Sequence, residues 1–281
     1  MKRTLGTLGL ALAVFCLGLG TAQAEHADLM KAAQTFQQMV DEGQTADLMT
    51  KIDLYRVAGL SYQPSLVLPM EKILSCKNEE QIRTLAGMYT FDSNYALAMG
   101  NGVMALTTKQ FVRDSLLPRL NVSRKLEIEP ISQNLLKRLV ENPNDPQIRA
   151  QVIAQATLNT KRIAELSADP EVMDLVVDTF FGSIIEGLYV ACTLAKDAEM
   201  TPEMIDLFME QLNRFESFDT FFHNFKDEQC LAFVEMADRD GLIHTVIDRL
   251  SETKGRLTGA DIDMFLSLVE PVRAPLAKLC K

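Results

Sequence analysis

The chain has 281 residues and a formal net charge of −10, with 28 Lys and Arg against 38 Asp and Glu. Because its basic side chains are scattered rather than clustered, this acidity argues against nucleic acid and anionic membrane surfaces as partners. The length suits one large domain or two small ones.

The first twenty-four residues have the pattern of a secretory signal peptide. Lys2 and Arg3 precede an apolar run over residues 8–19, and Ala22-Gln23-Ala24 supplies an A-x-A cleavage site. We therefore expect cleavage between Ala24 and Glu25. Residues 1–24 are the predicted signal peptide, residues 25–281 the exported domain, and the predicted location is periplasmic or secreted.

Two other readings of the N-terminus are disfavoured. A lipoprotein signal needs a small residue before its cysteine, whereas Phe15 precedes Cys16. The apolar run is also shorter than the ~20 residues that span a bilayer. The mature chain is therefore predicted to carry neither a lipid nor an N-terminal anchor.

Helix-start signals recur through the mature chain. Asp145-Pro146, Asp169-Pro170 and Thr201-Pro202 each place a capping side chain before a proline at the first helical position. Asn78 with Gln81 and Thr258 with Asp261 are typical of capping boxes. Sustained period-two alternation, the signature of strands, is missing. The pattern predicts an all-α fold.

The predicted helices lie near residues 25–42, 45–58, 65–76, 79–100, 108–118, 130–141, 146–166, 170–197, 202–225, 228–238, 242–254 and 259–279. The last contains Pro271 and Pro275, where a bend could occur. Residues 120–130 and 141–146 are the most linker-like, so a domain boundary near residue 143 is conceivable. Because neither stretch is long or of low complexity, we favour a single domain.

The segment from Pro170 to Asp197 is the predicted centre of the fold. Between Val176 and Ala195 its only charges are Asp178 and Glu186, so it is apolar nearly all round. Such a helix is either buried or crosses a membrane. A carboxylate at the middle of a bilayer costs roughly 2.5–3.5 kcal/mol or more. We therefore expect a buried helix and no transmembrane span in the mature chain.

Four cysteines follow the cleavage site: Cys76, Cys192, Cys230 and Cys280. An oxidising compartment allows them two disulfides in any of three connectivities. We favour Cys230 with Cys280, which would tie down the C-terminus and leave Cys76 to pair with Cys192. The alternative is that Cys192, in an apolar helix, is a small buried hydrophobic residue.

Signatures of the common enzyme classes are missing. The sequence contains no phosphate-binding glycine loop, no G-x-S-x-G and no H-E-x-x-H. Its three histidines, His26, His223 and His244, are too dispersed to indicate a metal site. We expect no cofactor and no metal, and the sequence favours a non-enzymatic protein.

Six phenylalanines fall within eighteen residues, at intervals that place most of them along one side of a helix. They are Phe208, Phe215, Phe218, Phe221, Phe222 and Phe225. The favoured interpretation is a core-facing stripe. The alternative is an apolar groove for a hydrophobic ligand or a partner helix.

Two predicted helices each carry a carboxylate on an otherwise apolar face. Asp92 lies between Tyr89 and Tyr95 at intervals of three, and Glu186 precedes Tyr189 by three. A buried carboxylate must find hydrogen-bond donors, a cation or a raised pKa. If the helices meet, the acids could join a structural network, line a cavity for a cationic or hydroxylated ligand, or act as an acid and base pair.

These segments carry a resemblance. The pattern Gly87-x-Tyr89-x-x-Asp92-x-x-Tyr95-Ala96, followed by Gly182-x-x-x-Glu186-x-Leu188-Tyr189-x-Ala191, is similar to paired segments of an uncharacterised family of secreted, often lipid-anchored, all-helical bacterial proteins. The resemblance implies an all-α exported domain over about residues 50–250 and implies no activity. The chain departs from the family in lacking the lipoprotein cysteine and in having Ile184-Ile185 where the family has a bulky aromatic residue.

The leading hypothesis from the sequence is a non-enzymatic exported helical protein that binds a small ligand or a partner protein. Its candidate binding residues are Tyr89, Asp92, Tyr95, Glu186 and Tyr189. Two alternatives stay open. One is a hydrolase that uses Asp92 and Glu186 as a carboxylate pair, and the other is a structural or assembly protein that uses the Phe208 to Phe225 stripe.

Overall fold

A computed structural model of the chain describes residues 27, 29–42, 54–70, 78–126, 132–142, 145–196, 198–223 and 239–278. Within these ranges the chain forms helices and no strand, which confirms the predicted all-α class. The predicted signal peptide and its cleavage site lie outside the described residues. So do Cys76, Cys230, Cys280 and the helix expected over 228–238.

The described helices follow one another in a simple order. An N-terminal helix over residues 29–41 comes first. The labelled α-helices are α3 (Leu54–Val57), α4 (Glu79–Ala98), α5 (Gly102–Phe111), α6 (Gln133–Glu141), α7 (Pro146–Glu165), α8 (Pro170–Ala195), α9 (Pro202–His223), α10 (Arg239–Thr253) and α11 (Gly259–Lys278). Shorter turns are the 3-10 turn η1 (Pro64–Leu66), the π-turn η3 (Val112–Leu116) and the 3-10 turns η4 (Leu117–Arg119) and η5 (Asn121–Arg124).

Capping side chains begin the helices where the sequence predicts. The Asp145 side chain accepts hydrogen bonds from two backbone N–H groups of the first turn of α7, and Asp169 accepts one at the start of α8. Thr258 and Asp261 form a reciprocal capping box at α11, with each side chain accepting from the other's backbone N–H. Helix starts could therefore be predicted because their determinants are local.

Two predicted boundaries are wrong. Residues 65–70 are not the start of a helix, because the 3-10 turn η1 ends at Leu66 and Val67 is extended with φ −70° and ψ 138°. Pro69 lacks the N–H that a helix would use, and the alternating burial of Leu66 and Leu68 has the period of an extended chain. The helix expected near 108–118 instead begins at Gly102 and widens into η3.

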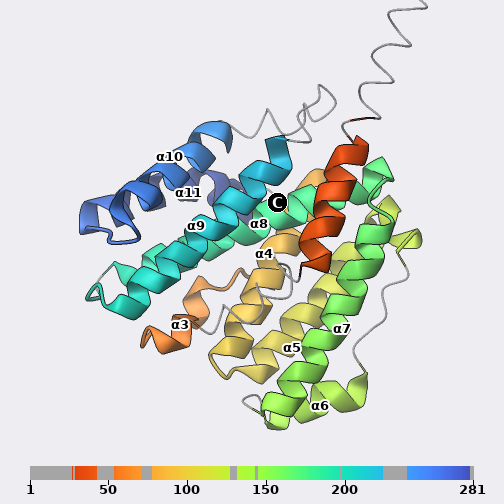
Figure 1. Cartoon of the computed structure of the whole chain (residues 1–281). Helices are drawn as coiled ribbons and strands as arrows, with labels where there is room; N and C mark the ends of the chain where they lie inside the picture. Colours follow the sequence, from red (N-terminus) through yellow and green to blue (C-terminus); the bar gives the residue numbers. More distant parts are fainter. Residues whose placement is uncertain are drawn as a thin grey trace, which may run out of the picture.

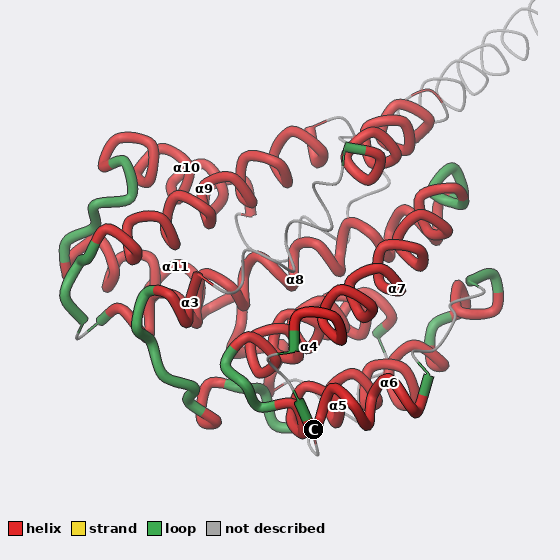
Figure 2. Tube along the Cα trace, turned by 60° about the horizontal axis from the view of Figure 1, so that its bottom comes forward, coloured by secondary structure: helices red, strands yellow, loops and turns green. Residues whose placement is uncertain are grey.

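Helix α8 lies at the centre of the molecule. In Figure 1 it runs through the middle, with α9, α10 and α11 on one side and α4, α5, α6 and α7 on the other. Figure 2 shows the same division from another direction. By length and composition α8 could cross a membrane, but 78% of its most apolar window is buried inside the protein. Helix α8 is accordingly the core helix of this fold.

The phenylalanine stripe on α9 faces the core. Phe208, Phe215, Phe218 and Phe221 are fully buried, which confirms the favoured interpretation for these four residues. Phe218 packs against Phe180 and Phe181 of α8. The side chains of Phe222 and Phe225 lie outside the described part of the chain.

Two glycines let the backbones of α4 and α8 touch. A Cβ atom at Gly87 would lie 2.0 Å from the backbone oxygen of Thr179, and one at Gly182 would lie 2.1 Å from that of Thr84. Both distances are far below contact, so any other residue at either position would push the helices apart. The two glycines therefore set the spacing of the central helix pair.

The close approach predicts a strong effect of one methyl group. Gly182→Ala should destabilise the protein by about 2–3 kcal/mol, because an added Cβ meets backbone rather than a movable side chain. Gly259→Ala is the matched control, since a Cβ there meets nothing within 4 Å. Urea unfolding followed by circular dichroism measures both. Equal stability of the two variants would contradict the proposed role of the glycine contact.

Candidate functional site

The two predicted acids meet in the core between α4 and α8. Asp92 and Glu186 both have 0% exposure, and their carboxyl groups are hydrogen-bonded to each other. Gly87 and Gly182 lie about one turn before them on their respective helices. The glycine contact therefore brings the two acids together.

The positive charge that neutralises these acids is Arg273, from α11. Its Nε donates to Oε2 of Glu186 at 2.7 Å, and its Nη2 donates to Oε1 at 2.7 Å, which makes a two-pronged ion pair. The guanidinium carbon also lies 3.8 Å from the centroid of the Tyr189 ring. We name Asp92, Glu186 and Arg273 the charged cluster.

The surroundings of Asp92 favour its neutral form. Its Oδ2 accepts from the backbone N–H of Leu68 at 3.0 Å, whereas Oδ1 has no N–H or hydroxyl donor among the described residues. Burial and the charge of Glu186 raise the pKa of Asp92 well above its usual range. Burial also raises the pKa of Glu186, but Arg273 opposes that effect. The arginine therefore favours the ionised form of Glu186 over that of Asp92.

The predicted tyrosines hold a segment of residues 61–69, which contains the 3-10 turn η1 with extended backbone at Gln63 and Val67 on either side; we name it the strap. The Tyr95 hydroxyl accepts from the backbone N–H of Gln63 at 3.1 Å and lies 3.3 Å from the Ser61 carbonyl oxygen, to which it donates. The Tyr89 hydroxyl donates to the Pro69 carbonyl at 3.1 Å. The hydroxyls thus bind backbone of the strap instead of the acids.

The charged cluster holds the strap as well. Nη2 of Arg273 donates to the Leu66 carbonyl at 2.9 Å, and Asp92 accepts from Leu68. The Leu66 and Leu68 side chains are both buried, in different apolar clusters. Side chains from α4 and α11 therefore meet at one short piece of backbone.

Sequence reasoning missed Arg273. An isolated arginine in a helix is ordinarily a surface residue, and this one lies 87 positions after Glu186. The available signal was the requirement that a buried carboxylate find a cation. That requirement predicts a cation near the carboxylate but does not identify the residue. Only the packing of α11 on α8 shows that the cation is Arg273.

A second buried ion pair joins α4 and α8. Nε of Arg83 in α4 donates to Oδ2 of Asp178 in α8 at 2.7 Å, and Asp178 is fully buried. Because Arg83 precedes Asp92 and Asp178 precedes Glu186, the two pairs show that α4 and α8 run in the same direction. Two polar links along one helix pair fix its register.

Cys192, near the C-terminal end of α8, is a free and buried thiol among the described residues, and the other three candidate cysteines lie outside them. Burial raises the pKa of the thiol far above its usual range. The residue therefore packs as a small hydrophobic side chain, which was the stated alternative.

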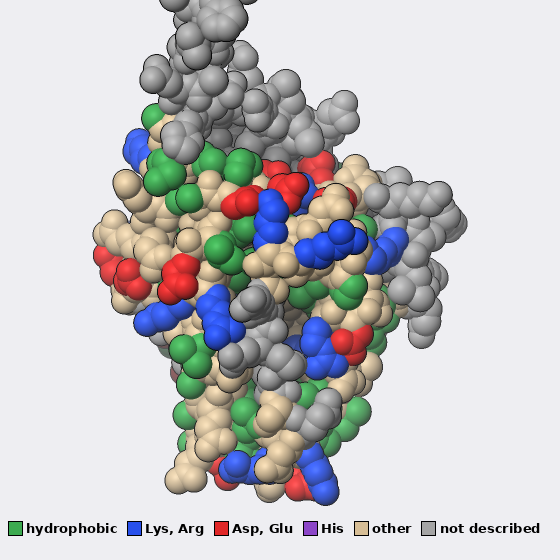
Figure 3. All heavy atoms as spheres, turned by 90° about the vertical axis from the view of Figure 1, so that its right-hand side faces the viewer, with side chains coloured by type: hydrophobic (Ala, Val, Ile, Leu, Met, Phe, Trp, Pro, Cys, Tyr) green, Lys and Arg blue, Asp and Glu red, His purple; other side chains and the backbone are tan. Residues whose placement is uncertain are grey.

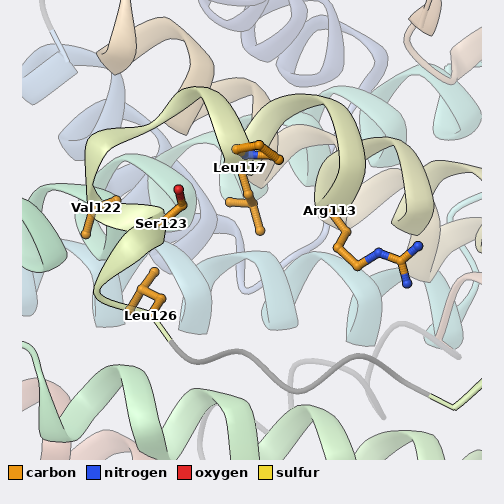
Figure 4. A pocket seen from close by; sticks show the side chains of 6 residues that line it. Arg113, Leu117, Val122, Ser123 and Leu126 are labelled. Atoms are coloured by element: carbon orange, nitrogen blue, oxygen red, sulfur yellow. The ribbon is translucent and has the colours of Figure 1, made fainter.

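A hollow of about 250 Å³ lies apart from the cluster, along η3 to η5 (Figure 4). It is lined by Arg113, Leu117, Pro118, Val122, Ser123 and Leu126. The Arg113 guanidinium is already bound by both oxygens of Asp114, and the Ser123 hydroxyl donates to the Leu120 carbonyl. These polar groups are engaged by the protein itself, so the hollow offers mainly apolar contacts.

The described residues offer no evident metal site. No group of three His, Cys, Asp or Glu side chains within them could hold a metal ion. On the face drawn in Figure 3, acidic and basic side chains are interspersed rather than gathered by sign.

Removal of the arginine tests the electrostatics of the cluster. Arg273→Met should destabilise the protein by about 3–5 kcal/mol at neutral pH, because Glu186 would be buried without its cation. The loss should shrink as the pH falls, since Glu186 can then take up a proton. Lys125→Met is the control, because Lys125 pairs with Asp169 and Glu171 at 2.7 and 2.8 Å on the surface, and it should change stability little. Chemical unfolding at pH 7 and pH 5 distinguishes the two variants, and equal effects would contradict the assignment.

Comparison of the chain with protein-family models, with curated proteins and with solved structures finds no match. The geometry of the charged cluster and the strap is therefore the basis on which a function can be proposed.

Proposed function

We propose that the chain is an exported, non-enzymatic helical protein that binds a partner, and that the partner supplies an extended apolar peptide segment which binds where the strap lies. The proposal rests on one observation: side chains from outside the strap form hydrogen bonds with its backbone. Export is supported by the charged start, apolar run and Ala22-Gln23-Ala24 of the N-terminus.

The strap is held as an extended peptide ligand would be. Five hydrogen bonds join its backbone to Tyr89, Asp92, Tyr95 and Arg273, none of which belongs to the strap. Leu66 and Leu68 insert into the core, while the intervening Val67 is only partly buried. Backbone hydrogen bonds with alternate side chains in pockets are the usual basis of extended-peptide recognition.

The strap also has fewer regular backbone hydrogen bonds of its own than the core helices have. Its internal hydrogen bonds are two turn contacts, Leu66 N–H to the Gln63 carbonyl and Val67 N–H to the Pro64 carbonyl. Helices α4 and α8, in contrast, carry continuous backbone hydrogen bonds along 20 and 26 residues. Segments with few regular hydrogen bonds open locally at lower free energy than core helices.

The geometry of the acids supports binding rather than hydrolysis. A glycoside-cleaving pair holds its carboxyl groups roughly 5 to 9.5 Å apart, on either side of the substrate bond. Asp92 and Glu186 are hydrogen-bonded to each other, and both oxygens of Glu186 are bound by Arg273. This arrangement leaves no substrate atom or water between the two acids.

A peptide fits the site better than a small molecule does, because the polar atoms of the cluster already bind backbone groups. The third candidate function, assembly through the phenylalanine stripe, is less well supported. Phe208, Phe215, Phe218 and Phe221 are engaged in the core and leave no aromatic surface for a second copy.

A synthetic peptide tests the proposal. We expect a fluorescent peptide with the sequence of residues 61–69 to bind a Leu66→Ser, Leu68→Ser double variant at least about tenfold more tightly than wild type. The variant loses two apolar anchors of its own strap, each worth roughly 1.5–3 kcal/mol, while the groove stays intact. Fluorescence anisotropy measures the affinity.

The control peptide carries serine in place of the same two leucines and should not bind. Circular dichroism and unfolding curves must show that the double variant is folded, and a Leu68→Ser single variant serves if it is not. If neither variant binds the wild-type peptide at concentrations that saturate any specific site, the proposed peptide site does not exist.

A further inference from the structure

The charged cluster contains two acidic groups but only one basic group. Two carboxyl groups, Asp92 and Glu186, are fully buried against each other, and the nitrogen atoms of one cation, Arg273, donate to Glu186 and not to Asp92. The side chain of Arg273 is itself only 13% exposed. If both acids were ionised, the cluster would hold two negative charges and one positive charge without access to solvent, an arrangement that low-polarity surroundings strongly disfavour.

We infer that Asp92 and Glu186 form a binding site for a single shared proton, and that this proton couples the pH of the surroundings to the contact between α4 and α8. The inference goes beyond partner binding and does not depend on it. Its basis is that the two carboxyl groups are fully buried against each other and that Oδ1 of Asp92 has no N–H or hydroxyl donor among the described residues. A proton on Asp92 satisfies both acids at once.

The other titratable groups around the pair keep their charge over the relevant range. Asp92 and Glu186 are faced by Tyr95 from α4, Tyr189 from α8, Arg273 from α11, Tyr55 from α3 and Tyr62 from the strap. Burial raises the pKa of Tyr62 to about 12 and also raises those of Tyr55 and Tyr95. A charge change inside the cluster between weakly acidic and weakly alkaline pH therefore belongs to the two acids.

Loss of the proton leaves two buried carboxylates side by side between α4 and α8 and lowers the stability of the fold. The folded protein keeps a proton on Asp92 at pH values where the unfolded chain, with an ordinary aspartate pKa of about 3.9, has released it. Stability from this site is therefore complete below that value and is lost as the pH rises toward the folded pKa. Across that interval the unfolding equilibrium constant should rise by up to about tenfold per pH unit.

The decisive comparison is between wild type and Asp92→Asn. The asparagine amide can donate to Glu186 and its oxygen can accept from Leu68, so both hydrogen bonds persist while the titrating proton is removed. We expect the stability of wild type relative to Asp92→Asn to fall as the pH rises from 5 to 8, measured by urea unfolding. Asp178→Asn, which alters the other buried ion pair between α4 and α8, is the control and should keep the wild-type pH dependence at the cluster.

A second readout observes the proton directly, and its wild-type arm needs no variant. The infrared spectrum of the wild-type protein at pH 7 should contain the carbonyl stretching band of a neutral carboxylic acid. In variants that circular dichroism shows to be folded, Asp92→Asn should lose this band and Asp178→Asn should keep it. Hydrogen exchange of the core amides of α4 and α8, corrected for its intrinsic pH dependence, should speed up as the band disappears at higher pH. A wild-type spectrum without that band at pH 7, or equal pH dependence in wild type and Asp92→Asn, would overturn the inference.

Discussion

The contact between the backbones of α4 and α8 is the constraint on which the rest of the structure depends. Gly87 and Gly182 remove the side-chain layer that normally separates two helices, so groups on facing stripes come within hydrogen-bond reach. Asp92 meets Glu186 and Arg83 meets Asp178 for this reason. The close helix spacing that glycine permits thus determines which polar groups are buried together. Because these groups include buried acids, the fold must also supply groups that neutralise them.

The groups that neutralise the buried acids determine how the segments are arranged more than they stabilise the fold. Buried ion pairs contribute little net free energy, because the cost of removing the charges from water offsets their attraction. Their geometric demand is high, since a charge buried without its partner is costly. Arg273 can satisfy Glu186 only when α11 lies in its place on α8, and its remaining contact with the Leu66 carbonyl requires the strap to lie beside it. The cluster therefore selects one arrangement of three segments that are far apart in sequence.

The predictable features are those with local causes. Asp145 and Asp169 begin helices because a capping side chain acts on the next few N–H groups, and the apolar α8 could be assigned to the core from its composition. The two acids could be proposed as a buried pair from their positions on apolar faces. The helix predicted over residues 65–76 is wrong where it overlaps the strap, because the conformation of the strap is determined by side chains elsewhere in the fold. Arg273 could not be identified because its partner is 87 positions away.

The position of Arg273 along the chain has a consequence for how the molecule reaches its folded state. The strap and α4, α8 and α9 all precede α11, yet Glu186 is without its cation until α11 packs against α8. The contact between Arg273 and Leu66 spans 207 positions, so its loop-closure entropy is large. A chain that emerges from its N-terminus first can assemble the apolar layers around α8 early, but it completes its buried charges only at the end. Before that step, an early intermediate should keep Glu186 protonated or hydrated, so that charge neutralisation marks the final stage of folding rather than its beginning.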